Sequence, residues 1–406
     1  MKATVLIVEA RAALKTAAKF VAHKTTLPVL ECVCIVPNGA FLLISATNLD
    51  RAVVMEMPAF KIEKEGEGLC LPGKRLSELI DVYPPSGFVD MSFNKDTAQL
   101  SAGTMKNSVK GMPVSEFPLV KTELEGATKF TVAADKLIRG LKDVVETAAT
   151  NDSRLILPAV HFKIGKTTLN LVSADGYRLG VHTIDVNSDV EGNINVPRKV
   201  VEDLIPLLPS GDELVQVIFT DSQVMFEFRG LNSCDTWLTA QLVEGQFLDY
   251  QAIVPKETTY TVEVLTSEIE RAVRAANVFA RESSFTGRFH VDAVISQMIV
   301  SGVSAETGQS VVGVGVAVTK PEEAPNEFDI AFNLKYMQDF LKVAGTQRVK
   351  MEFTTPASPG VFRPVERNGM LHVIMPMHTT DHRGPIVVES PPVEASSENL
   401  PPLVEE

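Results

Sequence analysis

Positively charged side chains recur at helical spacing along this chain, and cations arranged in stripes suit the binding of phosphate groups. The first set follows a four-residue spacing, which places its members on one face of a helix. Two further sets also stay on one side of their expected helices. The three sets are Arg11, Lys15 and Lys19, with Lys24 just after them; Lys136, Arg139 and Lys142; and Arg271, Arg274 and Arg281. Each of these sets is followed by a shorter group of cations, at Lys74 and Arg75, at Arg198 and Lys199, and at Lys335 and Lys342.

The composition around these cations indicates what kind of nucleic acid they suit. Few aromatic residues are interleaved with them, so stacking on single-stranded bases is not expected. The Asn, Gln and Arg clustering of a recognition helix is also missing, so binding would not depend on base sequence. The net charge of −13 does not exclude such a surface, because total charge governs solubility and long-range repulsion. A solvated helix face explains any one set alone, but it explains three corresponding sets less well.

Catalytic chemistry has little support in the sequence. The seven His residues are scattered, and no HExxH, CxxC or Gly-rich phosphate loop is present. Gly313-Val314-Gly315 lacks a third glycine, and Asp175-Gly176 fits a turn between strands better than a catalytic carboxylate. We therefore predict no catalytic residue, no metal site and no cofactor. An enzyme remains the first alternative, and turnover of a nucleotide by the pure protein would favour it.

The elements that carry the cations belong to a pattern that occurs three times. Pro72, Pro197 and Asn333 each precede apolar residues at three-to-four spacing, so each predicts the start of a helix. The three copies lie about 125 and 136 residues apart, in the range of one small domain. One other helix is expected earlier in each copy, and a strand entering a polar turn lies between the two helices. The expected opening helices span 9–22, 133–147 and 267–280.

These repeats predict an α+β fold of three domains, each with two helices packed on antiparallel sheets. We place the domains at residues 1–127, 128–256 and 257–378. Residues 379–406 are rich in Pro, Ser and Glu and contain no aromatic residue, so they are expected to form a disordered tail.

Composition also bears on location. An apolar share of 45% is ordinary for globular domains, and no run of eighteen apolar residues could cross a membrane. The amino terminus does not resemble a secretory signal, and four cysteines in 406 residues do not form a disulfide framework. We expect reduced, buried thiols and a cytoplasmic, nucleoid-associated protein.

Simple geometry indicates what three such domains are for. A domain of this size is about 35 Å across, so three in a closed triangle leave almost no central hole. Six in a ring leave a hole of about 35 Å, enough for a DNA duplex. Three repeats would therefore form half of a six-domain ring, completed by a head-to-tail homodimer.

With the repeats in view, the chain resembles the bacterial β sliding clamps, the processivity subunits of replicative DNA polymerases. The resemblance covers Met1 to about Met377. It rests on these stretches: Thr26-Leu27-Pro28-Val29-Leu30, Asn151-Asp152-Ser153-Arg154, Ser173-Ala174-Asp175-Gly176-Tyr177-Arg178-Leu179, Val196-Pro197-Arg198-Lys199, Glu244-Gly245-Gln246-Phe247-Leu248-Asp249-Tyr250 and Val373-Ile374-Met375-Pro376-Met377.

The resemblance implies a ring whose helices line the pore, and an apolar cleft that takes a linear peptide from polymerase subunits, the clamp loader and other clients. The cleft residues carried over by position are Leu157, Gly176, Tyr177, Arg178, Leu179, Leu248, Ile253, Phe285, Asn333, Tyr336, Val373, Ile374, Met375, Pro376 and Met377. The positions matching the family's DNA contacts are Lys24, Asn151, Arg198 and Lys199. Methionine and branched side chains suit a pocket that must accept varied partners.

Three features depart from the family's pattern. Leu248 stands where Pro is usual, Tyr177 stands where His is common, and 28 residues follow His378 where the family usually ends. We hypothesise that this tail lies over the cleft and competes weakly with clients; unchanged client affinity after its deletion would refute that.

For the dimer, Val109 and Phe279 are the expected apolar contacts. The second alternative for the whole chain is a repeat scaffold that binds proteins but not DNA.

Overall fold

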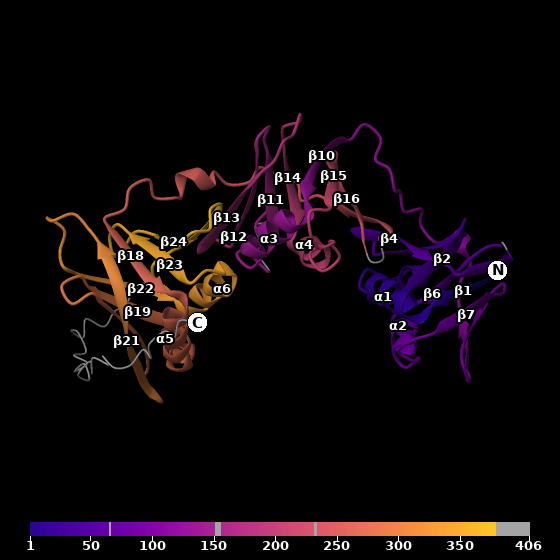
Figure 1. Cartoon of the computed structure of the whole chain (residues 1–406), viewed down its shortest axis with the longest axis horizontal. Helices are drawn as coiled ribbons and strands as arrows, with labels where there is room; N and C mark the ends of the chain where they lie inside the picture. Colours follow the sequence, from indigo (N-terminus) through magenta and orange to yellow (C-terminus); the bar gives the residue numbers. More distant parts are fainter. Residues whose placement is uncertain (65, 151–155, 231–233, 379–406) are drawn as a thin grey trace, which may run out of the picture. The chain divides into compact units, whose positions relative to one another are not determined.

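The computed structural model describes residues 1–64, 66–150, 156–230 and 234–378. Asn151 and the predicted tail at 379–406 lie outside these residues. The chain divides into two compact units, which are described separately (Figure 1). Unit 1 is Met1–Val254 with Glu366–Val373, and unit 2 is Pro255–Val365 with the chain from Ile374 on. Unit 1 therefore contains the first two predicted domains.

Each predicted domain begins with a strand and not, as expected from the sequence, with a helix. These strands are β1 (Lys2–Leu6), β10 (Thr128–Ala133) and β18 (Tyr260–Leu265). In β1 the buried residues are Ala3 and Val5, the alternation of a strand with one face in the core. The helical spacing of the cations that follow is a stronger sequence signal than the alternation within these short strands.

The opening helices are α1 (Ile7–Ala17), α3 (Ala134–Val145) and α5 (Thr266–Ala280). The prediction for α1 was wrong at its end, because the helix stops five residues before Ala22. There the amides of Lys19 and Phe20 bond to the carbonyls three residues back, and the Phe20 side chain is fully buried. Lys19 thus lies in the turn after α1, outside the helical stripe of Arg11 and Lys15.

The second helices are α2 (Gly73–Asp81), α4 (Arg198–Leu204) and α6 (Leu334–Ala344). Asn333 caps α6 as predicted, with its side-chain oxygen accepting from the backbone N–H of Lys335. Pro72 and Pro197 occupy the capping position itself, one residue before the first turn where they were expected. In Figure 1, α1 lies beside α2, and the two helices pack together.

The remaining strands pair antiparallel wherever a register is recorded, in agreement with the predicted fold class. Those of the first domain are β2 (Cys32–Asn38), β3 (Phe41–Thr47), β4 (Arg51–Pro58), β5 (Lys61–Lys64), β6 (Leu69–Pro72), β7 (Phe88–Phe93), β8 (Thr97–Ala102) and β9 (Met105–Lys110). Those of the second are β11 (Ala159–Ile164), β12 (Thr168–Ala174), β13 (Arg178–Asp185), β14 (Gly192–Pro197), β15 (Leu214–Phe219), β16 (Gln223–Arg229) and β17 (Asp235–Gln241). Those of the third are β19 (Thr286–Asp292), β20 (Gln297–Ser304), β21 (Gly308–Thr319), β22 (Glu327–Asn333), β23 (Arg348–Phe353), β24 (Gly360–Pro364) and β25 (Met370–Ile374).

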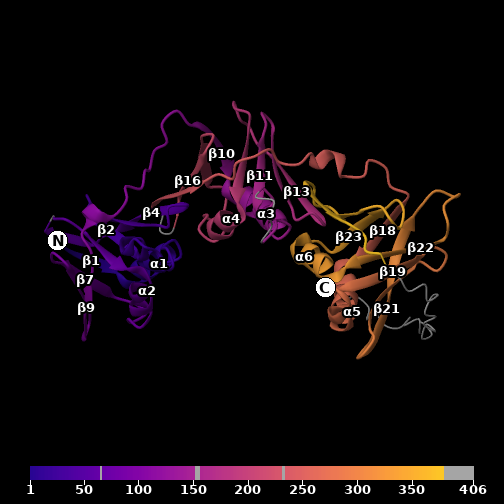
Figure 2. The same ribbon diagram turned by 180° about the vertical axis from the view of Figure 1, so that it is seen from behind.

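One sheet of unit 1 joins the first two domains. Its order is β10-β15-β16-β17-β4-β3-β2-β6, and the pair β17 with β4 crosses from one domain to the other. The Arg51 guanidinium, on β4, lies 2.9 Å from the buried Asp203 carboxylate on α4. Figure 2 shows the strands of this joint from behind. The first and second domains are therefore held together by backbone hydrogen bonds and a buried ion pair.

The register of the strands confirms the threefold repeat. Cys32 pairs with Pro72, Ala159 with Pro197 and Thr286 with Asn333, so the strand before each second helix is paired in the same way. In each domain, the chain that follows the last strand then forms a backbone hydrogen bond to the residue two positions before Pro72, Pro197 or Asn333. The N–H groups of Met112, Val243 and Met377 donate to the carbonyls of Cys70, Asn195 and Ala331, at 2.8, 2.9 and 2.8 Å.

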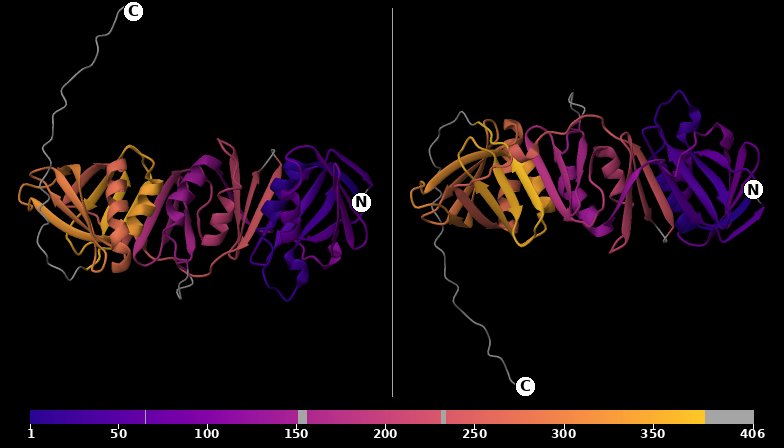
Figure 3. Two further views of the ribbon diagram at one scale, coloured as in Figure 1. Left: turned by 90° about the horizontal axis from the view of Figure 1, so that it is seen from below. Right: turned by 90° about the horizontal axis from the view of Figure 1, so that it is seen from above.

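Residues 366–373 lie within the predicted third domain in sequence but belong to unit 1. Gly369 accepts the N–H of Thr183 at 2.9 Å, and Nε2 of the buried His372 lies 2.6 Å from the carbonyl oxygen of Asp143. The buried Asp143 carboxylate contacts the guanidinium of Arg367 and lies 2.7 Å from Nδ1 of His182. This segment is thus fastened to the buried side of α3. Figure 3, seen from below, shows the magenta helices of the second domain in front of its strands.

Candidate functional site

The cations of α1 are largely used within the first domain. Arg11 donates from Nη2 to the carbonyls of Tyr83 and Pro84, at 2.9 and 3.0 Å, and from Nε to that of Ile80 at 3.3 Å. Lys15 forms a 3.0 Å ion pair with Asp81. These contacts hold α1 against the end of α2, so a phosphate group would have to compete with them.

The cations of α3 are arranged differently. Lys136, Arg139 and Lys142 are exposed, and none forms an ion pair with another residue in the described part of the chain. Lys74, at the start of α2, is likewise exposed and unpaired within those residues. On α5, Arg271 donates to its own helix at Ser267, and Arg274 lies 3.8 Å from Glu270. Such solvent-exposed pairs are weak and yield readily to a stronger anion.

The DNA-contact positions that the resemblance implies also differ from one another in how exposed and how strongly paired their side chains are. Lys24 is exposed in a left-handed turn, with φ of 56°. Lys199 is 58% exposed, with carboxylates of Asp203 and Glu202 at 3.1 and 3.6 Å. Arg198 is only 14% exposed and is bound on three sides by protein. All of these DNA contacts stay predictions.

The carboxyl end of α3 collects donors from several elements. A helix leaves its last four carbonyls without internal partners, and cationic donors suit that end. His372 lies at the carbonyl of Asp143, Thr147 donates to that of Val144, and Arg178 donates to that of Glu146 at 2.5 Å. Beyond the helix, Arg198 donates to the carbonyl of Ala148. The end of α3 is thus a junction between the residues predicted to face DNA and those predicted to face clients.

In unit 1, the predicted client residues surround the turn from β12 to β13. The Asp175 carboxylate accepts the N–H groups of Tyr177 and Arg178, each at 3.0 Å, and the Arg178 guanidinium at 2.9 Å. Gly176 has φ of 90°, which favours glycine. This confirms Asp175-Gly176 as a structural turn. Leu157, Leu179 and Val373 are buried beside it in unit 1, whereas Tyr177 is 65% exposed.

The segment 243–250 brings Leu248 into the same unit. Asn195 donates from Nδ2 to the carbonyls of Val243 and Gly245, at 3.2 and 3.0 Å, and its Oδ1 lies 2.8 Å from Nδ1 of His161. The His161 ring stacks on Phe247 with centroids 4.8 Å apart. Burial lowers the pKa of His161, so its neutral form is favoured in this contact. Ile253 follows with its side chain exposed.

Unit 2 carries the other predicted client residues. Asn333 donates weakly to Ser284, and the neighbouring Phe285 has φ of 59°. Thr286 donates to the Met377 sulfur at 3.6 Å, which fixes the end of the Val373–Met377 stretch. Ile374 is buried, and Met375 is the exposed member. Tyr336 and Pro376 are half-buried.

The predicted dimer residues are not the most exposed apolar side chains near their positions. Val109, on the edge strand β9, packs against the core of unit 1, and Phe279 on α5 is half-buried. Val278 is 61% exposed and Val303 on β20 is 49% exposed. These two residues were not among the predicted dimer contacts. Phe279 has the larger apolar side chain and was therefore predicted, but the adjacent Val278 on the helix faces solvent.

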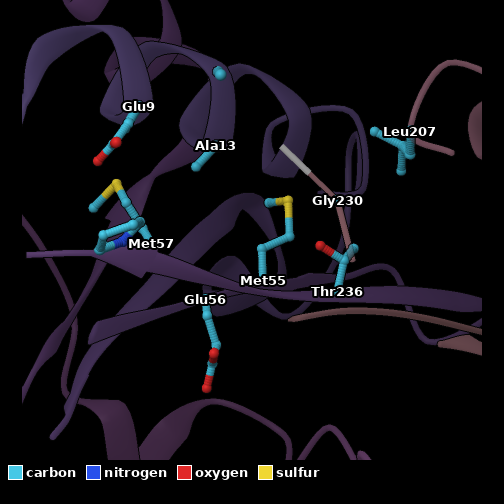
Figure 4. Close-up of a pocket in the computed structure, with 10 residues that line it drawn as sticks. Glu9, Ala13, Met55, Glu56, Met57, Leu207, Gly230 and Thr236 are labelled. Carbon is cyan, nitrogen blue, oxygen red and sulfur yellow. The ribbon is translucent and has the colours of Figure 1, made fainter. Parts of the chain in front are cut away.

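Two cavities lie in the joint between the first and second domains. The smaller, of about 30 Å³, has room for little more than one water molecule. Figure 4 shows Met55 and Met57 of β4 pointing toward α1 and Glu56 pointing away, with Thr236 of the second domain beside Met55 and Leu207 farther to the right. Burial raises the pKa of Glu9, which also lines it. The larger cavity, of about 250 Å³, is lined by residues that include Leu49, Leu119 and Thr239.

Other site types have little basis in the structure. Among the residues described, no three His, Cys, Asp or Glu side chains are grouped so that they could hold a metal ion. No helix within the described ranges is long and apolar enough to cross a membrane. The four cysteines are buried and unpaired by disulfides, as expected. Burial raises the pKa of the Cys32 thiol to about 11, which keeps it protonated.

Comparison with known proteins gives a consistent result. The chain is 24% identical to the beta sliding clamp of Synechococcus elongatus over 375 residues, covering 91% of this chain and 97% of that protein. It is 26% identical to the beta sliding clamp of Caulobacter vibrioides over 367 residues, covering 88% and 94%. The crystal structure of the DNA polymerase III subunit beta from Pseudomonas aeruginosa shares the fold, with a TM-score of 0.82 at 22% identity over 93% of this chain and 100% of that chain.

Family models for the DNA polymerase III beta subunit match three successive segments. The N-terminal domain matches residues 2–121, the central domain 131–249 and the C-terminal domain 251–378. These segments are similar to the predicted domains, although the boundaries proposed from the sequence stay predictions. The chain therefore consists of three clamp domains, and it belongs to the DNA polymerase III beta subunit family.

Proposed function

We propose that this chain is a DNA sliding clamp, an accessory protein that encircles duplex DNA and tethers a polymerase to it. The observation that carries the proposal is the match of three successive segments to the three domains of one family. The exposed cations of α3 support it, because they suit phosphate contact without base recognition. In this role the chain has no catalytic site of its own and works in the cytoplasm, at the nucleoid.

The ring would be a head-to-tail homodimer of six domains. Weak phosphate contacts are sufficient in such a ring, since topology and not affinity retains it on DNA. Val278 and Val303 are now better candidates for the dimer contact than Phe279, because their side chains are exposed on unit 2. Val109 and Phe279 remain proposed as residues near the contact.

Clients would bind through a short peptide to the residues gathered in each unit. In unit 1 these include Tyr177 and Ile253, and in unit 2 Met375; all three are exposed apolar side chains. A suitable probe is a synthetic peptide from the replicative polymerase of the same organism that binds the wild-type protein. Loss of its binding in both Ile253→Lys and Met375→Lys identifies it as a ligand of this site, here called the client peptide.

The decisive experiment measures retention on DNA of different topology. The clamp, loaded onto nicked circular plasmid by the clamp loader, is passed through a sizing column before and after linearisation. We expect coelution with the circle, release from the linear form, and a solution mass near twice the 44.1 kDa of the chain. A scaffold that binds proteins alone would not coelute with either DNA. A protein monomeric at every concentration, with equal retention on both DNA forms, would refute the proposal.

A further inference from the structure

Arg198 is the residue at which the two predicted surfaces meet. Its Nε lies 2.8 Å from the Glu202 carboxylate and its Nη2 lies 3.0 Å from that of Glu146. Nη1 donates to the backbone carbonyl of Ala148, which is buried. A guanidinium that has three of its five N–H donors bound to protein, on a side chain only 14% exposed, has little capacity left for a phosphate.

The groups that Arg198 holds are those that support the client residues of unit 1. Glu146 accepts Arg178 at its carbonyl oxygen, while its carboxylate pairs with Arg198. Ala148 is followed by Ala149, whose N–H donates to the carbonyl of Leu157 at 3.1 Å. Two members of the proposed client site are therefore anchored on residues 146–149, and Arg198 fixes that segment from the other side.

We propose that Arg198 is a positioning residue, which orders residues 146–149 so that Arg178 and Leu157 are held for the client peptide, and that it is not a phosphate ligand. This inference rests on the proposed function and reassigns one residue within it. Lys199, its neighbour, keeps the phosphate role because its side chain is 58% exposed and its ammonium group contacts only the carboxylates of Asp203 and Glu202 among the described residues.

The two roles make opposite predictions for a substitution that keeps the charge. Lysine can hold a phosphate as a point charge, but it cannot reproduce the planar fork that reaches three acceptors. Arg198→Lys should therefore weaken client-peptide binding by about tenfold, the effect of losing hydrogen bonds to a charged group. The salt dependence of duplex binding by this variant should be the same as that of the wild type.

Lys199→Gln is the matched control, since it changes the adjacent residue on the same helix turn. It should lower the slope of log K against log salt by about 0.9, the contribution of one phosphate contact, and leave peptide affinity unchanged. Arg198→Met completes the set, and it should match Arg198→Lys in both measurements. The inference is overturned if Arg198→Met lowers the salt slope of duplex binding, Arg198→Lys keeps the wild-type slope, and neither variant changes the affinity for the peptide.

Amide hydrogen exchange gives a measurement that needs neither DNA nor client. Protection of the Ala149 amide should fall in Arg198→Lys and persist in Lys199→Gln, with unchanged exchange in the β15–β17 strands showing that the fold is intact. Unchanged protection of Ala149 in Arg198→Lys would overturn the positioning role. If protection falls as expected but no polymerase peptide binds the wild type, the failure lies with the proposed function and the structural role of Arg198 stands.

Discussion

The first and second domains use one framework for different purposes. In both, an arginine at the start of a strand donates to a backbone carbonyl just after the opening helix: Arg51 to Lys19 at 3.3 Å, and Arg178 to Glu146. Arg51 then pairs with Asp203 of the second domain, whereas Arg178 pairs with Asp175 in its own turn. The same position thus forms a joint between domains in one copy and part of an exposed turn in the other.

The opening helices differ in a related way. The cations of α1 brace the helix against its own domain, while those of α3 point to solvent. On the buried side, α1 has Thr16 at the position where α3 has Asp143. The repeat therefore defines where side chains stand, and the identity of each side chain decides whether the position stabilises the fold or is free to bind. Three predictions test this contrast.

The largest effect is expected at the buried carboxylate. Asp143→Asn should lower the free energy of unfolding of unit 1 by about 4 kcal/mol, because the buried carboxylate is lost from its ion pair with Arg367 and from its contact with His182. Thr16→Val, at the corresponding position of α1, should change it by less than about 1 kcal/mol. Urea unfolding followed by the fluorescence of Trp237, the only tryptophan of the chain, measures both. Equal losses in the two variants would remove the contrast between the buried faces.

A smaller effect should separate the exposed faces. Arg11→Met should lower the free energy of unfolding by about 2 kcal/mol, since three carbonyls lose their donor, and hardly change the salt slope of duplex binding. Arg139→Gln should leave stability unchanged and lower that slope by about 0.9. The comparison requires both measurements on both variants. A reversed pattern would mean that α1, and not α3, contacts the phosphates.

The smallest effect is expected in the dependence of stability on pH. The pair His161 and Asn195 stands in the second domain where Cys34 and Cys70 stand in the first, and burial lowers the pKa of His161. Because the unfolded chain binds the proton more readily, stability should fall as pH drops below about 6.5, the ordinary pKa of histidine. Urea midpoints between pH 7.5 and 5.5 should decline less in His161→Gln than in the wild type. Parallel declines would show that His161 contributes nothing to the pH dependence.

Much of this architecture was predictable from the sequence alone. The three helix starts at Pro72, Pro197 and Asn333 carry local signals, since proline and asparagine favour helix beginnings regardless of distant contacts. The spacing of the cations placed most of them on the opening helices for the same reason, although Lys19 and Arg281 lie just beyond the ends of α1 and α5. Local order of this kind depends on neighbouring residues, and the threefold repeat made it easy to recognise.

The tertiary structure alone decided what each of those residues does. Arg11, Lys142 and Arg198 are all cations on repeated helices, yet one braces two helices, one is exposed to solvent and one joins the end of α3 to a neighbouring helix. Their partners are carbonyls and carboxylates from distant parts of the chain. No spacing rule encodes such contacts, because a guanidinium binds whichever acceptors the packing of other elements brings within reach.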